Sequence, residues 1–124
     1  MLFESLKEEG EMGTNYYVVS STPTIQHPIH IGKSSIGWKF LFHRVNKWDN
    51  WVNDEPINTF PQWKEFLETY TNKNRIVVMN EYDEVVPLED LLNLIEIKQK
   101  EDNPDNFSYA DNIDGYRFTS DEFC

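Results

Sequence analysis

Hydrophobic and polar positions alternate along several stretches of the chain, and this period of two predicts β-strands. The clearest stretch is Trp38–Val45, in which the aromatic residues Trp38, Phe40 and Phe42 fall on one face. The predicted strands are Asn15–Ser20, Ile29–Ile31, Trp38–Val45, Arg75–Met79 with a short return at Glu84–Val86, and Gly115–Phe118. A turn at Asn112–Gly115 precedes the last strand, because Asp-Gly favours a tight hairpin connection.

Two further stretches repeat their hydrophobic residues at helical spacing. The first begins at Thr59, a good N-cap residue, with Pro61 in the first turn and a stripe made of Trp63, Phe66, Leu67 and Tyr70. The second begins at Pro87 and continues to about Lys100, with a stripe made of Leu88, Leu91, Leu92 and Ile95. These elements predict an α+β fold, an antiparallel sheet of about four to six strands with two helices packed on one face.

Residues 1–11 differ from the pattern that follows them. Codons for Glu8-Glu9-Gly10 can contain a ribosome-binding sequence shortly before the codon of Met12. One interpretation is therefore that residues 1–11 are a non-native or disordered leader and that residues 12–124 form a single α+β domain. The alternative, a short N-terminal helix of ordinary origin, stays open.

The net charge of −11 is concentrated near the C-terminus. Residues 80–124 carry thirteen acids and three bases, whereas residues 12–79 carry five acids and seven bases. An acidic surface repels phosphates, so direct nucleic-acid binding is not expected, and a basic protein is the expected partner. The candidate partner-binding acids are Asp111, Asp114, Asp121 and Glu122. The alternative is that these acids only keep a small protein in solution.

Several function classes are disfavoured by what the sequence lacks. No apolar run is long enough to span a membrane, and the first residues do not resemble a signal peptide, so we expect a cytosolic protein. The single cysteine, Cys124, allows neither an internal disulfide nor a cysteine-based zinc site. No paired carboxylates or nucleophile elbow indicate catalysis, so neither a catalytic residue nor a cofactor is predicted.

Gly32-Lys33-Ser34 matches the end of a phosphate-binding P-loop, but the surrounding residues do not. That motif needs a glycine at position 27, where this chain has His27, and a helix directly afterwards. A strand follows instead, so we interpret this stretch as a β-hairpin with a turn over residues 32–37. A small anionic ligand is the alternative role of the hairpin, with the candidate contacts His30, Lys33, Ser34, Ser35 and His43.

A metal site is not expected at the histidines. His27, His30 and His43 could supply imidazole ligands, but Pro28 separates the first from the predicted strand. No carboxylate stands at a regular spacing from them. We interpret them as separate histidines on the polar face of the sheet.

Trp48 and Trp51 lie in the predicted loop Asn46–Asn58. Exposed tryptophans of this kind are often the centre of a protein-binding surface. The alternative is that both rings fold over the edge of the sheet as part of the core.

Three motifs together resemble a group of small bacteriophage and prophage proteins. They are Met12-Gly13-Thr14-Asn15-Tyr16-Tyr17, then His30-Ile31-Gly32-Lys33-Ser34-Ser35 with Gly37-Trp38, and finally Asp114-Gly115-Tyr116-Arg117-Phe118. The resemblance covers nearly the whole chain from Met12. Many members carry a C-x-x-C pair before the second motif, which implies a small zinc loop, whereas residues 18–29 here contain no cysteine.

The resemblance implies a phage protein made in the host cytoplasm. The expected function is a non-enzymatic accessory protein that binds a host or phage macromolecule, such as a basic host protein, in host takeover or counter-defence. The alternatives are a protein or enzyme that binds a small anion or nucleotide derivative at the hairpin, and a component of the virion. The oligomeric state stays open.

Overall fold

The computed structural model describes residues 13–23, 26–35, 37–101 and 111–119. The elements are β1 (Thr14–Ser20), β2 (Ile29–Ser34), β3 (Leu41–His43), α2 (Phe60–Asn72), β4 (Ile76–Asn80), β5 (Val85–Val86), α3 (Leu88–Lys98), β6 (Asp111–Ile113) and β7 (Tyr116–Thr119). The proposed leader, residues 1–11, lies outside the described residues. Within the described ranges, no helix is long and apolar enough to cross a membrane.

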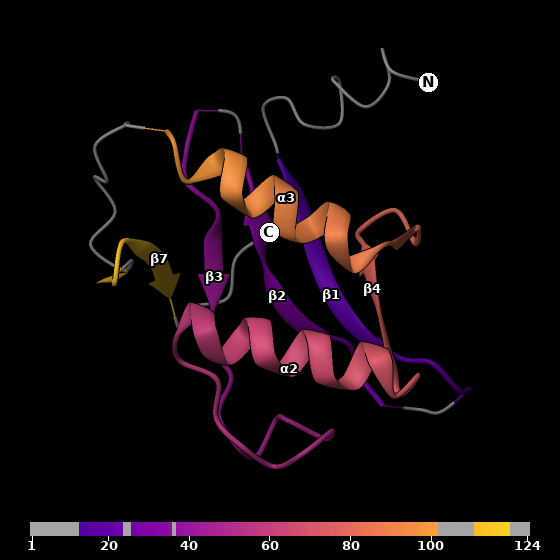
Figure 1. The fold of residues 1–124 in the computed structure, drawn as a ribbon. Helices are drawn as coiled ribbons and strands as arrows, with labels where there is room; N and C mark the ends of the chain where they lie inside the picture. Colours follow the sequence, from indigo (N-terminus) through magenta and orange to yellow (C-terminus); the bar gives the residue numbers. More distant parts are fainter. Residues whose placement is uncertain (1–12, 24–25, 36, 102–110, 120–124) are drawn as a thin grey trace.

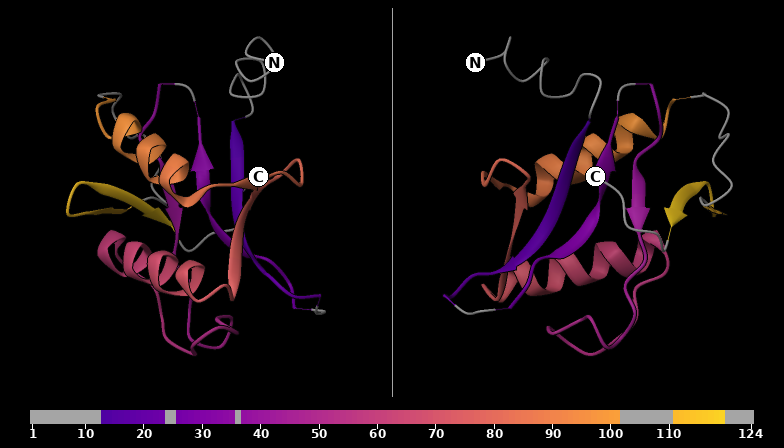
Figure 2. Two further views of the ribbon diagram at one scale, coloured as in Figure 1. Left: turned by 45° about the vertical axis from the view of Figure 1, so that its right-hand side comes forward. Right: turned by 180° about the vertical axis from the view of Figure 1, so that it is seen from behind.

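The strands form one sheet in the order β5-β4-β1-β2-β3-β7-β6. Neighbouring strands are antiparallel except for β3 and β7, which are parallel. Helices α2 and α3 lie side by side on one face of the sheet (Figure 1), and the view from behind has the strands in front of both helices (Figure 2). The predicted α+β class, with two helices on one face, is confirmed. The seven strands include three very short ones, β3, β5 and β6.

The core lies between the sheet and the two helices. Trp63 and Leu67 of α2 and Leu91 and Ile95 of α3 are almost completely buried there, as the helical spacing predicts. From the sheet, the fully buried side chains include Val18, Ile31, Phe40, Phe42 and Phe118. The rings of Phe42 and Phe118 stack at 5.0 Å, and this contact links the parallel pair β3 and β7. Aromatic packing therefore joins β3 to β7, although the two strands are far apart in the sequence.

The predicted signals at element ends act as expected. The Thr59 hydroxyl accepts a hydrogen bond from the Gln62 backbone N–H at 3.3 Å, and α2 begins at the next residue. Pro87 directly precedes α3. Asp114 and Gly115 both have positive φ, 54° and 87°, which two-residue hairpins of type I′ require between strands such as β6 and β7.

Strand β2 continues beyond the predicted end because it contains a β-bulge. The pairing with β1 moves from Tyr16↔Gly32 to Tyr17↔His30, so Ile31 is an extra residue on β2. Gly32, Lys33 and Ser34 therefore belong to the strand and not to the predicted turn. A Cβ atom on Gly32 would lie 2.4 Å from the Phe40 ring, so only glycine allows this approach.

Candidate functional site

The bulge in β2 brings together two of the predicted site residues, His30 and His43. Their rings stack with centroids 5.4 Å apart, and the Tyr17 ring also stacks on His30, at 4.8 Å. Because Ile31 is buried and His30 precedes it, the imidazole lies on the face of the sheet away from the helices. The prediction of separate histidines therefore holds for His27 alone, whose side chain is exposed.

A chain of hydrogen bonds fixes the His30 ring. Its Nε2 lies 2.9 Å from Asn15 Oδ1, while the Asn15 amide group donates to Glu81 Oε1 at 2.8 Å. The Asn15 backbone N–H donates to the same carboxylate oxygen at 2.7 Å. Since the Asn15 oxygen can only accept, His30 donates through Nε2. Sequence reasoning did not find Glu81, because it follows β4 and lies 66 residues from Asn15 in the chain.

Burial lowers the pKa of His30 to about 4, because water no longer solvates the charged ring. The neighbouring His43 and, less strongly, Lys33 lower it further by charge repulsion. A backbone hydrogen bond with Gly32 and the Glu81 carboxylate act in the opposite direction. His30 is therefore neutral near pH 7 and serves there as a hydrogen-bond donor to Asn15.

The remaining hairpin residues do not form a P-loop cradle. Ser34 is fully buried, and its Oγ has no hydrogen-bond partner within the described ranges. Lys33 and Ser35 lie close to Gly13, where a Cβ would be 2.9 Å from Lys33 Cε and 2.7 Å from Ser35 Oγ. Among the described residues, no group of three histidine, cysteine or carboxylate side chains could hold a metal ion.

The loop between β3 and α2 (residues 46–58) is fixed from inside by one asparagine. Asn50 is fully buried, and its amide nitrogen donates to Asn53 Oδ1 at 2.7 Å and to the Glu55 carbonyl at 2.8 Å. Its oxygen accepts from the backbone N–H groups of Val52 and Asn53. At the base of the loop, Val45 and Ile57 exchange two backbone hydrogen bonds. We call residues 46–58 the tryptophan loop.

The two tryptophans of this loop have different environments. Trp51 is half-buried, packs against the core, and donates from Nε1 to the His27 carbonyl at 2.8 Å. Trp48 is 83% exposed, and the ammonium group of Lys47 lies 4.7 Å from its ring. The two alternatives for these residues are therefore divided between them, with Trp51 packed against the core and Trp48 on the surface.

Two of the four predicted acidic residues lie within the described ranges, and both belong to the hairpin of β6 and β7. Asp114 is exposed in the turn between β6 and β7, and Asp111 is the first residue of β6. Asp121 and Glu122 lie outside the described residues. Other exposed carboxylates, from Glu81 to Asp90, surround the turn after β4 and the start of α3.

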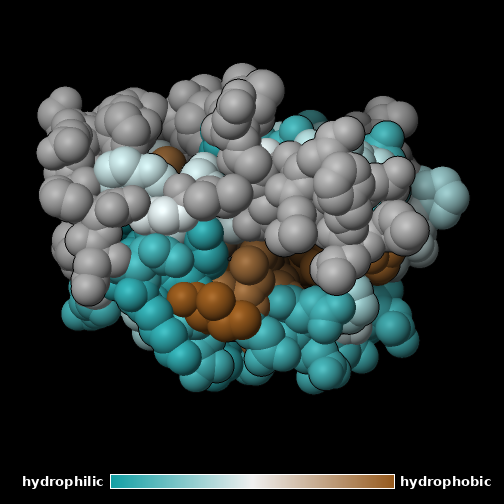
Figure 3. Space-filling model, turned by 90° about the horizontal axis from the view of Figure 1, so that it is seen from above, coloured by the Kyte–Doolittle hydropathy of each residue, from teal (hydrophilic) through white to brown (hydrophobic). Residues whose placement is uncertain are grey.

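Exposed hydrophobic side chains other than Trp48 are few in the described part of the chain. Those with large exposed fractions are Tyr82, Val85 and Ile97. Seen from above, the described surface has a small hydrophobic area bordered by hydrophilic residues (Figure 3). No other aromatic side chain in the described ranges is as exposed as Trp48.

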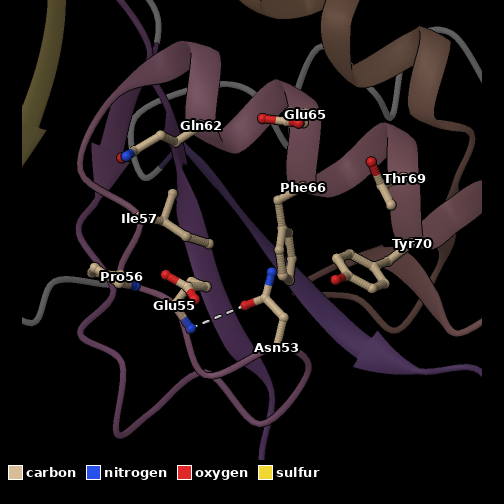
Figure 4. A pocket seen from close by; sticks show the side chains of 9 residues that line it. All are labelled: Asn53, Glu55, Pro56, Ile57, Gln62, Glu65, Phe66, Thr69 and Tyr70. Atoms are coloured by element: carbon tan, nitrogen blue, oxygen red, sulfur yellow. Dashed lines mark hydrogen bonds between the residues drawn. The ribbon is translucent and has the colours of Figure 1, made fainter.

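Two pockets lie next to α2. One, of about 290 Å³, opens between the tryptophan loop and α2, and its lining residues project from both (Figure 4). The other, of about 430 Å³, lies between α2, α3 and the turn after β6. Neither contains the predicted hairpin residues.

Comparison of the chain with protein-family models, with curated proteins and with solved structures finds no match.

Proposed function

We propose that this chain is a non-enzymatic phage accessory protein that binds a basic protein in the host cytoplasm, with Trp48 as the central contact. The observation that carries the proposal is the 83% exposure of Trp48 on a loop that Asn50 fixes from inside. An exposed tryptophan leaves a large apolar surface in contact with water, and a partner that buries this surface gains free energy of binding.

The rigidity of the tryptophan loop supports the same proposal. Ordering a loop on binding costs conformational entropy, which weakens the complex. Here Asn50 and the Val45–Ile57 bridge already hold the loop. The backbone of the loop that carries Trp48 is thus already ordered, so less entropy is lost on binding.

The acidic charge supports a basic partner. The chain carries a net charge of −11, and Asp49, Asp54 and Glu55 are exposed in the tryptophan loop itself. Complementary charge increases the association rate and disfavours acidic partners. The phage origin and the role in host takeover or counter-defence follow from the resemblance and are part of the proposal.

The experiment is capture of a partner from host lysate by the tagged full chain over a range of salt concentrations. We expect a basic protein to be retained at low salt and released as salt increases. Trp48→Ala should weaken its binding about 30-fold. The matched control is Ile97→Ala on α3, where an exposed apolar side chain is also removed. Capture of nothing above background, or equal effects of both variants, would contradict the proposal.

A small anion bound beside Lys33 is the second candidate function. It is favoured by the grouping of Lys33 and Ser35 beside Gly13, where Lys33 Cε and Ser35 Oγ lie 2.9 and 2.7 Å from the position of a Cβ. Inorganic phosphate, added in an NMR titration, should shift the signals of residues 30–35 in the wild type and not in Lys33→Ala. Absence of such shifts would leave only the protein-binding function.

A further inference from the structure

The pocket between the tryptophan loop and α2 combines apolar and acidic walls. Ile57 and Phe66 are almost completely buried and form its apolar part. Glu55 projects from the loop and Glu65 from the helix, so the two carboxylates come from opposite walls (Figure 4). Tyr70 extends from α2 toward the loop beside Phe66. The pocket thus has negative charge at its edge and aromatic rings within it.

The carboxylates of this pocket have no ion-pair partner among the described residues. No described cation lies within salt-bridge distance of either Glu55 or Glu65, although both are exposed. Two cations of the chain lie over the neighbouring Tyr70 ring, Lys73 at 5.3 Å and Arg75 at 5.5 Å from its centroid. The Tyr70 ring therefore attracts cations already, while the two carboxylates are available to a cation from outside.

We propose that this pocket binds an arginine side chain of the basic protein partner. The inference rests on the proposed function and specifies the chemistry that the partner presents. A volume of about 290 Å³ admits one long side chain. The three-carbon stem of arginine suits the apolar wall at Ile57 and Phe66. Its planar guanidinium group presents several N–H donors and can pair with both carboxylates, which the compact ammonium group of lysine does less well.

The position of the pocket agrees with this assignment. Glu55 belongs to the same loop as Trp48, and Asn50 donates to the Glu55 carbonyl, which holds the loop backbone at the pocket. The arginine would add affinity and make binding sensitive to salt.

A direct test uses the free side chain as a probe. N-acetylarginine amide is added to the labelled full chain in an NMR titration at constant ionic strength, with N-acetylcitrulline amide as the neutral analogue of the same shape. We expect the arginine probe to shift the signals of residues 55, 57, 65, 66 and 70 with saturation in the millimolar range. Equal shifts from both probes, or none at these residues, would overturn the proposal.

Charge-removing variants give the second test. In Glu55→Gln/Glu65→Gln, the affinity for the arginine probe should fall about five-fold, as expected for loss of two partly exposed ion pairs. Glu68→Gln is the matched control, because Glu68 is an exposed carboxylate of α2 that does not line the pocket. An equal effect of the control would mean that the probe responds only to net charge, and the proposal would be wrong.

The same variants separate this inference from the proposed function. If Trp48→Ala abolishes capture of the partner and the double glutamine variant does not, the protein-binding function stands and the arginine site is wrong. If neither variant changes capture, both proposals fail.

Discussion

The rings of His30 and His43 stack at 5.4 Å on neighbouring strands, and this contact exists because β2 carries the extra residue Ile31. In a regular strand, side chains would keep alternating between the two faces of the sheet through Gly32. The bulge shifts this alternation by one residue after Ile31. Charge repulsion from His43 adds to the effect of burial and lowers the pKa of His30. The state of the His30 ring in this contact therefore depends on pH.

The first prediction concerns stability below neutral pH. The pKa of His30 is about 4 in the folded protein, compared with the ordinary value of 6.5 in the unfolded chain. As the pH falls, the unfolded chain therefore binds a proton at His30 before the folded protein does. The contribution of His30 is fully present above pH 6.5 and is lost between pH 6.5 and about 4. Its slope is at most about 1.4 kcal/mol per pH unit.

The measurement is urea unfolding of wild type and His30→Gln between pH 7 and pH 4. The difference between the two proteins should show the expected slope, since other titrating groups contribute to both. His27→Gln is the control, because the His27 side chain is exposed. An identical pH dependence in wild type and His30→Gln would contradict the pKa assignment.

The second prediction concerns Asn50. Asn50→Ala leaves the backbone N–H groups of Val52 and Asn53 and the Glu55 carbonyl without their partner. We expect a loss of about 2–3 kcal/mol in the free energy of unfolding, together with faster hydrogen exchange in the tryptophan loop. Asn58→Ala should change the unfolding free energy by less than about 0.5 kcal/mol, because only its backbone N–H makes a hydrogen bond.

The third prediction separates lack of space from backbone conformation at two glycines. A Cβ on Gly32 would lie 2.3 Å from the Leu41 carbonyl oxygen, so Gly32→Ala should destabilise the protein by at least about 3 kcal/mol. Gly115 has open space around the Cβ position but a φ of 87°. Gly115→Ala should therefore cost only about 1–2 kcal/mol. Thermal unfolding of both variants measures the difference, and equal losses would argue against the close contact at Gly32.

The fourth prediction concerns the start of α2. Thr59→Ala removes the side-chain oxygen that accepts from the Gln62 N–H, and we expect a loss of about 1 kcal/mol. Thr59→Ser keeps that oxygen and should stay within a few tenths of a kcal/mol of wild type. Denaturant unfolding of the two variants provides the comparison. A larger loss in the serine variant would assign the effect to the missing methyl group.

Local signals in the sequence predicted the elements that depend on neighbouring residues. The signals act on residues within one turn of the chain, so the sequence alone predicts their effects. They are Thr59, Pro87 and the Asp114-Gly115 pair. The parallel pairing of β3 with β7 was not predicted, because it depends on packing between Phe42 and Phe118 across a long stretch of chain.

The sequence likewise predicted some residues of the candidate site and not others. The sequence singled out Trp48 and Trp51, but only the Trp51 bond to His27 and its packing on the core distinguish the two. Glu65 carries no local signal, since a carboxylate on the outer side of a helix is ordinary. Its position at the pocket becomes apparent only when the loop and α2 are placed together.

The strand order has a consequence for how the protein is made. β1 lies between β2 and β4, and Tyr16 pairs with Asn80, while Leu41 of β3 pairs with Arg117. A ribosome therefore releases β1, β2 and β3 long before the strands that flank them, and this three-stranded piece has two open edges meanwhile. Such distant pairing makes folding slower than in a domain built from local contacts. During synthesis the nascent chain thus passes through a stage in which unpaired strand edges favour association with other chains.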